Sequence, residues 1–412
     1  MEGKKQGAYR APVGTYLKEI KEGIRAKDIV NTILLALLFA FYTLTFFVPR
    51  FYGLTEKYVG LFVFAVLFVM ACVNVNVAEK LKTKDRPFIV LCLLALVTLV
   101  NILIVDSGFG CFFVAADFAL IWYLCTEIRF FKWQSDLFGA LYTLMIIYWF
   151  FGVYTWMFAD YTSFAMNTNT AATFTVFSML CVLVFLEGLY ERYPIAGLFI
   201  TMALVKCFQI SLYHRSRGAF VMLGAYMVFR YIIPQKVWQK KGFYRAVCLI
   251  STLGSLVFVL LYIGLGASGV NFRMPFFYKN LFSGREAIWS EFLALFMKKP
   301  LTGIGTNVTI TSFFEFNVHN AMLNILVIHG IIVFALTLYL MFKRWSRGRE
   351  GAGGRRFAAL AAIFAVCIES FFDVDLIWTN YTLNVFFLLL AAFGGNRDKE
   401  PEAEALKGDA IS

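Results

Sequence analysis

The sequence predicts an all-α fold: a polytopic integral membrane helical bundle of about twelve transmembrane helices, with a long extracytoplasmic loop containing an amphipathic helix. Of its 412 residues 60% are hydrophobic and only 16% are charged, and the mean hydropathy is +0.72. A soluble domain cannot bury that much apolar surface. The apolar runs are about 20 residues long, which a helix needs to cross about 30 Å of hydrocarbon, and they lack the alternation of membrane β-strands.

The apolar runs divide the chain into five parts. We expect a basic cytoplasmic arm at 1–28, nine spans within 29–264, an extracytoplasmic loop at 265–318, three spans within 319–394, and a polar tail at 395–412 that we expect to be cytoplasmic and disordered. The predicted spans are, in chain order, 29–48, 58–76, 87–105, 109–126, 137–158, 170–187, 194–213, 218–233, 245–264, 320–342, 357–372 and 376–394.

The net charge of +12 has a topological explanation. Lysine and arginine gather in alternate connections between the apolar runs, as the positive-inside rule requires of cytoplasmic loops. Both termini are therefore predicted inside, membrane lipid is an expected partner, and nucleic acid is not. The first run is too long for a signal peptide and is predicted to be an anchor. The eight cysteines form no C-x-x-C pair and are interpreted as small apolar residues, so we expect no cofactor and no metal.

The long outer loop contains the first candidate for chemistry, at SGREAIW. Ser283 and Glu286 have the spacing of a capping box, which places Arg285 in the first turn of a helix that Pro300 stops. Free backbone N–H groups and an arginine at a helix N-terminus favour an anion such as a phosphate. An interfacial helix whose Arg285 contacts lipid phosphate or Glu286 is an equally good interpretation. The following PLTGIG is interpreted as a turn, because no strand precedes it and it lacks a nucleotide-binding fingerprint.

His319 and Asn320 stand at the mouth of the next predicted span. A histidine with a pKa near its usual value of about 6.5 can take a proton from a hydroxyl group at neutral pH, and Asn320 could orient it. A histidine that only caps the helix is the alternative. His329 lies inside the span on another helical face, so we interpret it as a core residue.

Two further outer connections carry polar residues. HRSRG contains Arg215 and Arg217, and arginines facing lipid cost about 2.5 to 3.5 kcal/mol, so at least one should have a partner. Arg217, next to Gly218, is the better candidate for a cavity, whereas Arg215 can extend to the headgroups. Asn167 and Asn169 precede the sixth span, where asparagine is also an ordinary helix cap. Asp373 and Asp375 form a D-x-D pair, which we treat as a weak match to metal chelation.

Several of these motifs occur together in one family. With NTNTAA, SRGAF, SGREAIW, PLTGIGT and VHNAMLNILVIHG in this order, the chain resembles the O-antigen ligase and O-antigen polymerase superfamily of bacterial envelope glycan transferases, most closely over residues 165 to 340. The resemblance implies a metal-independent, inverting transfer of a glycan from an undecaprenyl-diphosphate-linked oligosaccharide to a hydroxyl group of a glycan or lipid-linked acceptor. It places the site on the outer face of the cytoplasmic membrane.

The resemblance also assigns roles. It makes Arg217 and Arg285 the diphosphate-binding arginines and His319 the general base. Asn167 and Asn169 match in position only, because Thr168 stands where the family commonly has proline. The alternative from another class is a transporter or flippase of lipid-linked glycans, which would place polar groups and broken helices through the midplane. The candidate residues here cluster on one side, which favours the enzyme.

Overall fold

The computed structural model describes residues 23–105, 107–154, 168–269, 272–280, 282–312, 317–346, 348 and 354–394. Within these ranges every regular element is helical, apart from one isolated bridge between Arg273 and Asn280. The elements are α2 (Ala26–Phe47), α3 (Pro49–Asn74), α4 (Val77–Lys82), α5 (Arg86–Val105), α6 (Phe109–Leu124), α7 (Lys132–Tyr148), the π-helical η1 (Trp149–Tyr154), α9 (Thr168–Tyr190), α10 (Ala196–Tyr213), α11 (Arg217–Met227), the π-helical η2 (Val228–Ile232), α12 (Gln235–Trp238), α13 (Lys241–Ile250), α14 (Leu253–Ala267), α15 (Arg285–Phe296), α16 (Ala321–Trp345), α17 (Gly354–Glu369), the 3-10 turn η3 (Thr379–Tyr381) and α18 (Thr382–Phe393).

The structure is that of an all-helical, multi-pass membrane protein. In the described part of the chain, seven helices are long and apolar enough to cross a bilayer, or eight if the bent pair α13 and α14 counts as one span. Each of the twelve predicted segments contains a helix, but α6, α11, α17 and α18 are only 16, 11, 16 and 12 residues long. The predicted arm and tail fall largely outside the described residues, and the first described helix, α2, begins at Ala26.

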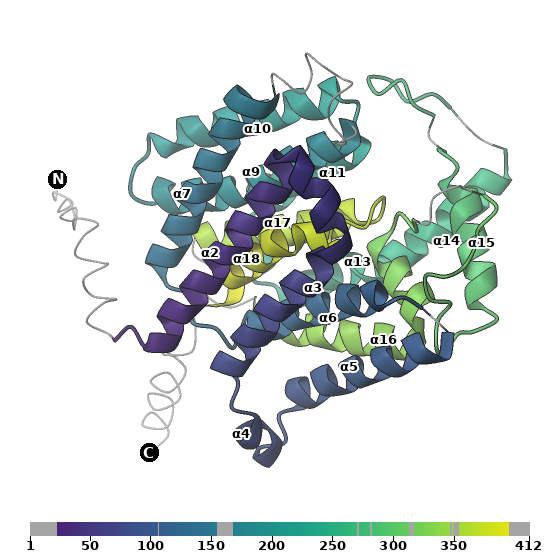
Figure 1. Cartoon of the computed structure of the whole chain (residues 1–412). Coiled ribbons are helices and arrows are strands. Elements are labelled where there is room, and N and C mark those ends of the chain that lie inside the picture. The colour runs from purple at the N-terminus through teal and green to yellow at the C-terminus, as the bar shows by residue number, and fades with distance from the viewer. Residues whose placement is uncertain are drawn as a thin grey trace, which may run out of the picture.

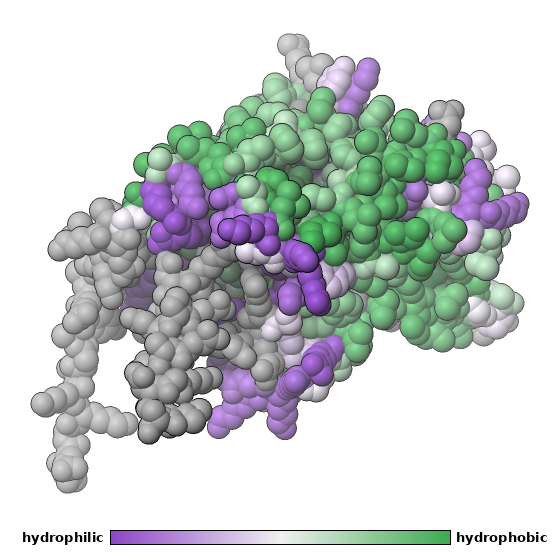
Figure 2. Space-filling view, turned by 90° about the horizontal axis from the view of Figure 1, so that it is seen from below, coloured by the Kyte–Doolittle hydropathy of each residue, from purple (hydrophilic) through white to green (hydrophobic). Residues whose placement is uncertain are grey.

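The core lies around α17 and α18. Figure 1 shows these two helices in the middle of the bundle, and α17 packs on α9, α11 and α18. Nearly every described side chain of α17 and α18 is buried, so neither helix shows an apolar stripe along its sequence. The outer helices instead expose large apolar side chains, as lipid-facing surfaces do, among them Leu103, Phe199 and Leu260. In Figure 2 apolar residues cover a broad area, with hydrophilic residues toward its edges.

The bundle has two chemically different ends. At one end, which we call the basic end, the Phe130 N–H before α7 donates to the Gly394 carbonyl after α18 at 2.9 Å. There Arg344 near the end of α16 donates to the Trp122 carbonyl near the end of α6 at 3.0 Å. The starts of α15 and α16 and the end of α17 lie at the other end, and Figure 1 shows α15 far from the start of α2. The predicted basic loops thus join helix ends that the structure brings together.

Two segments predicted as single spans are broken. The segment 245–264 is two helices, α13 and α14, inclined by 50°. Thr252 stands between them, and its hydroxyl donates to the Cys248 carbonyl at 2.9 Å, a bond that competes with the helical ladder. In α16 the backbone leaves helical geometry at Gly330, where φ is 85° and ψ is 168°. Such local breaks in a helix cannot be predicted from the polarity and periodicity of its side chains.

The PLTGIG segment fills the break in α16. The Ile304 and Gly305 N–H groups donate to the Val327 and Ile328 carbonyls at 2.9 and 3.1 Å, and the Ile331 N–H donates to the Pro300 carbonyl at 2.9 Å. The segment is therefore a turn, as its composition predicts, but it is a turn whose backbone replaces the missing helical hydrogen bonds.

Candidate functional site

A small polar cleft lies where five segments meet, at the end of the bundle opposite the basic end. Its volume is about 40 Å³, because charged side chains converge on it. The lining residues come from the start of α9, the start of α11, the loop before α15, α15 itself and the end of α17 with the turn after it. They are Asn169, Thr173, Ser216, Arg217, Gly218, Lys279, Arg285, Glu369, Phe372 and Asp373.

Arg285 is the first residue of α15, as the sequence predicts, but the predicted capping box is wrong. The N-cap is Gly284, whose φ of 87° lies in the left-handed region that glycine tolerates, and it makes no side-chain capping bond. The helix is held in place from its buried face, where the Trp289 indole N–H donates to the Val318 carbonyl at 2.7 Å. This places the Arg285 Nη2 atom 3.8 Å from Asp373 Oδ2.

His319 adjoins the cleft through the same carboxylate. Its Nδ1 atom lies 3.6 Å from Asp373 Oδ1, and both side chains are partly exposed. The backbone of His319 is left-handed, with φ at 50°, and its N–H donates to Asn317 Oδ1 at 2.9 Å. A left-handed residue other than glycine is uncommon and is often found at functional sites. Asp373 thus joins Arg285 and His319 into one group.

Asp373 is held as a carboxylate. Burial acts to raise its pKa, but the interaction with His319 and the charge of Arg285 outweigh burial and hold the pKa below its ordinary value of 3.8. The neighbouring Asp375 differs, because burial and the charge of Asp373 raise its pKa well above that value. The pKa values of the two carboxyl groups in the D-x-D pair are therefore shifted in opposite directions. Among the described residues, no group of three or more His, Cys, Asp or Glu is placed to hold a metal ion.

Arg217 reaches the cleft from another direction. It is the first residue of α11, whose N-cap Ser216 accepts the Ala219 N–H at 3.4 Å. The Arg217 Nη1 atom donates to the Asn280 carbonyl at 2.8 Å. A Cβ atom at Gly218 would lie 2.8 Å from Glu369 Oε1, so the glycine allows α11 to approach the end of α17 closely. The SRG motif therefore positions the arginine and permits the contact beside it.

Positive charge is crowded in the cleft. Lys279 Nζ donates to Asn169 Oδ1 at 3.3 Å. Burial and the charges of Arg217, Arg285 and Arg215 lower the pKa of Lys279 below its ordinary value of 10.5. Repulsion among these cations is relieved when an anion enters, so the cleft favours a multiply charged anionic group.

Besides His319, which adjoins the cleft, three of the predicted site residues are not among its lining residues. Arg215 is exposed and lies over the Tyr278 ring at 5.0 Å, outside the cleft lining. Asn320 is buried and caps α16, because its Oδ1 accepts the Leu323 N–H at 2.8 Å and its Nδ2 donates to the Phe371 carbonyl at 3.0 Å. Asn320 is therefore the residue that caps α16, a role that the sequence also allowed for His319. Asn167 lies outside the described residues.

Sequence reasoning missed two residues that line the cleft, Lys279 and Glu369. It also missed that Asp373 lines the cleft. Glu369 is 1% exposed at the end of an apolar helix, and a carboxyl group in such a segment is by itself a signal of function. Asp373 was visible only as part of a metal-like motif. Lys279 gave no signal, because its partner Asn169 is 110 positions away.

The arrangement can do two things chemically: bind a multiply charged anion, and hold an imidazole, a group able to transfer a proton near neutral pH, against a carboxylate. No protein-family model matches the chain, and no curated protein matches it. A function is therefore inferred from the geometry and from the motifs together.

Proposed function

We propose that this protein transfers a glycan from an undecaprenyl-diphosphate-linked donor to a sugar hydroxyl group, as a member of the O-antigen ligase and O-antigen polymerase superfamily. It would act as a polymerase or ligase in the assembly of O-antigen, capsule or exopolysaccharide. One observation carries the proposal: a cationic cleft and a histidine–carboxylate pair share Asp373, which lies 3.8 Å from Arg285 and 3.6 Å from His319.

The cations of the cleft would hold the diphosphate. Arginine presents a planar fork of donors that matches phosphate oxygens, and Arg217 and Arg285 enter from two separate helix N-termini. As the sugar leaves its carrier, negative charge develops on the departing diphosphate oxygen. Arg217, Arg285 and Lys279 would stabilise that charge in a partly buried site, where such interactions are stronger than in water.

His319 would accept the proton of the attacking hydroxyl group. Its Nδ1 atom lies 3.6 Å from Asp373 Oδ1, and we propose that Nε2 is the atom that takes the proton of the acceptor. The acceptor oxygen then forms a bond to the anomeric carbon while the bond from that carbon to the diphosphate oxygen breaks. The proton moves to His319, and Asp373 stabilises the imidazolium. One displacement of this kind inverts the anomeric centre.

The two ends of the bundle support the proposed orientation. Basic connections join helix ends at one end, and the cleft lies at the other, so under the positive-inside rule we propose that the cleft faces outward from the cytoplasmic membrane. Lipid-linked oligosaccharides are polymerised there in the proposed family.

A transporter of lipid-linked glycans is the second candidate, because α16 is broken at Gly330 and α13 and α14 are inclined by 50°. The break in α16 does not expose backbone groups for a passing substrate, however. Pro300, Ile304 and Gly305 bond to the carbonyl and N–H groups on both sides of it. The cleft cations also lie at one end of the bundle, so the enzyme is favoured.

Substitution of His319 by alanine tests the proposal. Cells that lack the chromosomal copy should make no polymer or ligated glycan with His319→Ala, although the variant reaches the membrane in normal amount. Lys299→Ala is the control, because Lys299 is exposed and lies outside the cleft lining. Glycan of normal length and amount in the His319→Ala strain would refute the assignment.

A further inference from the structure

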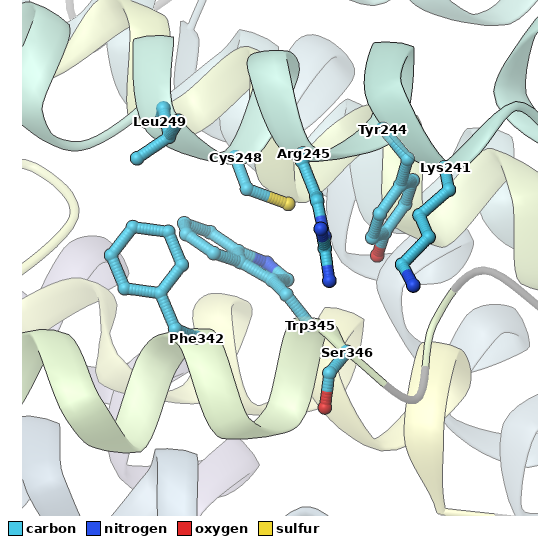
Figure 3. Close-up of a pocket in the computed structure, with 8 residues that line it drawn as sticks. All are labelled: Lys241, Tyr244, Arg245, Cys248, Leu249, Phe342, Trp345 and Ser346. Atoms are coloured by element: carbon cyan, nitrogen blue, oxygen red, sulfur yellow. The ribbon is translucent and has the colours of Figure 1, made fainter.

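A second pocket, larger than the cleft, lies at the basic end of the molecule. Its volume is about 430 Å³, and it opens between α13 and the last turn of α16. Figure 3 shows the eight lining side chains: Lys241, Tyr244, Arg245, Cys248 and Leu249 from α13, and Phe342, Trp345 and Ser346 from the end of α16. Since α16 begins beside the cleft and ends here, the two sites lie at opposite ends of that helix.

The pocket has a polar half and an apolar half. In Figure 3 the ammonium group of Lys241, the guanidinium group of Arg245 and the Tyr244 hydroxyl group gather on one side, while Leu249 and Phe342 face each other on the other. Lys241 and Arg245 are exposed, and in the described part of the chain neither forms an ion pair. A ligand that fits must be anionic at one end and apolar at the other.

Two buried donors face the pocket without an acceptor. The Tyr244 and Trp345 side chains are 4% and 1% exposed. Among the described residues, neither the Tyr244 hydroxyl group nor the Trp345 indole nitrogen has a hydrogen-bond partner. Buried donors of this kind are almost always satisfied in folded proteins. The pocket therefore offers two neutral donors beside two cations, which together suit a phosphate group.

The surroundings identify the source of that phosphate. Leu249 and its neighbour Ile250 are 48% and 55% exposed on α13, so the wall of the pocket continues onto an apolar outer surface. In a multi-pass membrane protein such a surface faces acyl chains. A free phosphate ion would leave the apolar half of the pocket empty, whereas a phospholipid fills both halves.

We propose that this pocket binds an anionic phospholipid of the leaflet at the basic end. The phosphate lies against Lys241 and Arg245 and accepts hydrogen bonds from Tyr244 and Trp345, and one acyl chain lies along Leu249 and Phe342. Under the proposed orientation this is the cytoplasmic leaflet, where a basic juxtamembrane pocket is expected to select anionic headgroups. The site is separate from the donor cleft and does not depend on the proposed reaction.

Thermal unfolding of the full-length protein in a neutral detergent tests the proposal. Added phosphatidylglycerol should raise the unfolding temperature in a saturable way, and phosphatidylcholine with the same acyl chains should not. The double variant Lys241→Gln, Arg245→Gln should bind phosphatidylglycerol at least about tenfold more weakly, because charge-assisted hydrogen bonds to the phosphate are lost. Leu249→Trp, at a half-exposed position that tolerates a larger side chain, should weaken binding while both charges remain.

The matched control is the double variant Lys236→Gln, Lys343→Gln. Both lysines are exposed and outside the pocket lining, and the change in net charge is the same. Retained binding in this control supports a specific site, whereas an equal loss would show diffuse attraction and overturn the proposal. Equal stabilisation by phosphatidylcholine would also overturn the proposal, because the pocket would then not select anionic headgroups. Equal stabilisation by inorganic phosphate alone would overturn it too, because binding would then not require an acyl chain.

Discussion

The junction between Gly330 and the PLTGIG segment predicts a large effect from one methyl group. Gly330 has φ at 85° and ψ at 168°, a region that is essentially restricted to glycine. A Cβ atom there would lie 2.1 Å from the Leu301 carbonyl oxygen. Because the obstacle is backbone, no side-chain rotation relieves it. Gly330→Ala must therefore separate the segment from α16.

The size of the destabilisation follows from the backbone strain at residue 330 and from the hydrogen bonds that are lost when the segment separates from α16. The backbone conformation costs alanine about 1 to 3 kcal/mol. Three hydrogen bonds cross the junction, from Ile304 to Val327, from Gly305 to Ile328 and from Ile331 to Pro300. Each contributes about 0.5 to 1.5 kcal/mol. The free energy of unfolding should fall by about 2.5 to 7.5 kcal/mol when the strain and the loss of the three bonds are added.

Buried cysteines provide the assay. Cys181, Cys207 and Cys367 are free and buried, so a thiol-reactive dye labels them only as the bundle opens on heating. Gly330→Ala should label at a temperature several degrees below the parent. Gly264→Ala is the matched control, because Gly264 is an exposed helical glycine with open space around its Cβ position, and alanine there should leave stability unchanged or raise it by about 0.5 to 1 kcal/mol. Equal labelling temperatures for Gly330→Ala and the parent would refute the described junction.

Three further predictions concern the end of the bundle that contains the cleft. Arg285→Lys should reduce glycan transfer by at least about tenfold, since lysine keeps the charge but lacks the planar fork, and transfer at the parental rate would remove Arg285 from diphosphate binding. Asp373→Asn should slow transfer and shift the pH dependence of the His319 step to lower pH, because the carboxylate that stabilises the imidazolium is gone; an unchanged pH profile measured in membranes would exclude that role. Glu291 accepts the Thr311 N–H at 2.7 Å, and its hydrogen bonds with that loop lower its pKa from 4.5 to about 2. Its stabilisation of the loop is thus present above about pH 4.5 and lost as the pH falls toward 2. The protection of the Thr311 amide against hydrogen exchange, relative to an unstructured peptide at the same pH, should therefore fall over that window in the parent and not in Glu291→Gln.

The sequence predicts the helical class well, because apolar runs of membrane length require helices whatever their partners are. It predicts the breaks poorly. The bend lies at Thr252, whose hydroxyl group bonds to the Cys248 and Leu249 carbonyls, and the break at Gly330 depends on a segment about 25 residues earlier that supplies the missing backbone partners. The break at Gly330 is a tertiary effect, and neither feature has a periodic signal in the sequence.

Some residues of the candidate site can likewise be predicted from the sequence, and others cannot. Arg285 is predictable because a local pattern starts a helix there, even though Gly284 replaces the expected cap. His319 and Arg217 follow from motifs at helix mouths. The role of Asp373 is not predictable, since it depends on the turn after α17 coming within 4 Å of residues from two other segments. Asn320 shows the opposite error: a polar residue beside a candidate base is in fact occupied in capping α16.

Hydrogen bonds connect all sides of the cleft to one another. Trp289 ties α15 to Val318, next to His319. Asn320 ties the start of α16 to Phe371, in the turn that carries Asp373, and Arg217 at the start of α11 donates to the Asn280 carbonyl in the loop before α15. The proposed base and the proposed diphosphate-binding arginines therefore belong to one connected framework, and a change in any of these loops alters the geometry on both sides of the cleft.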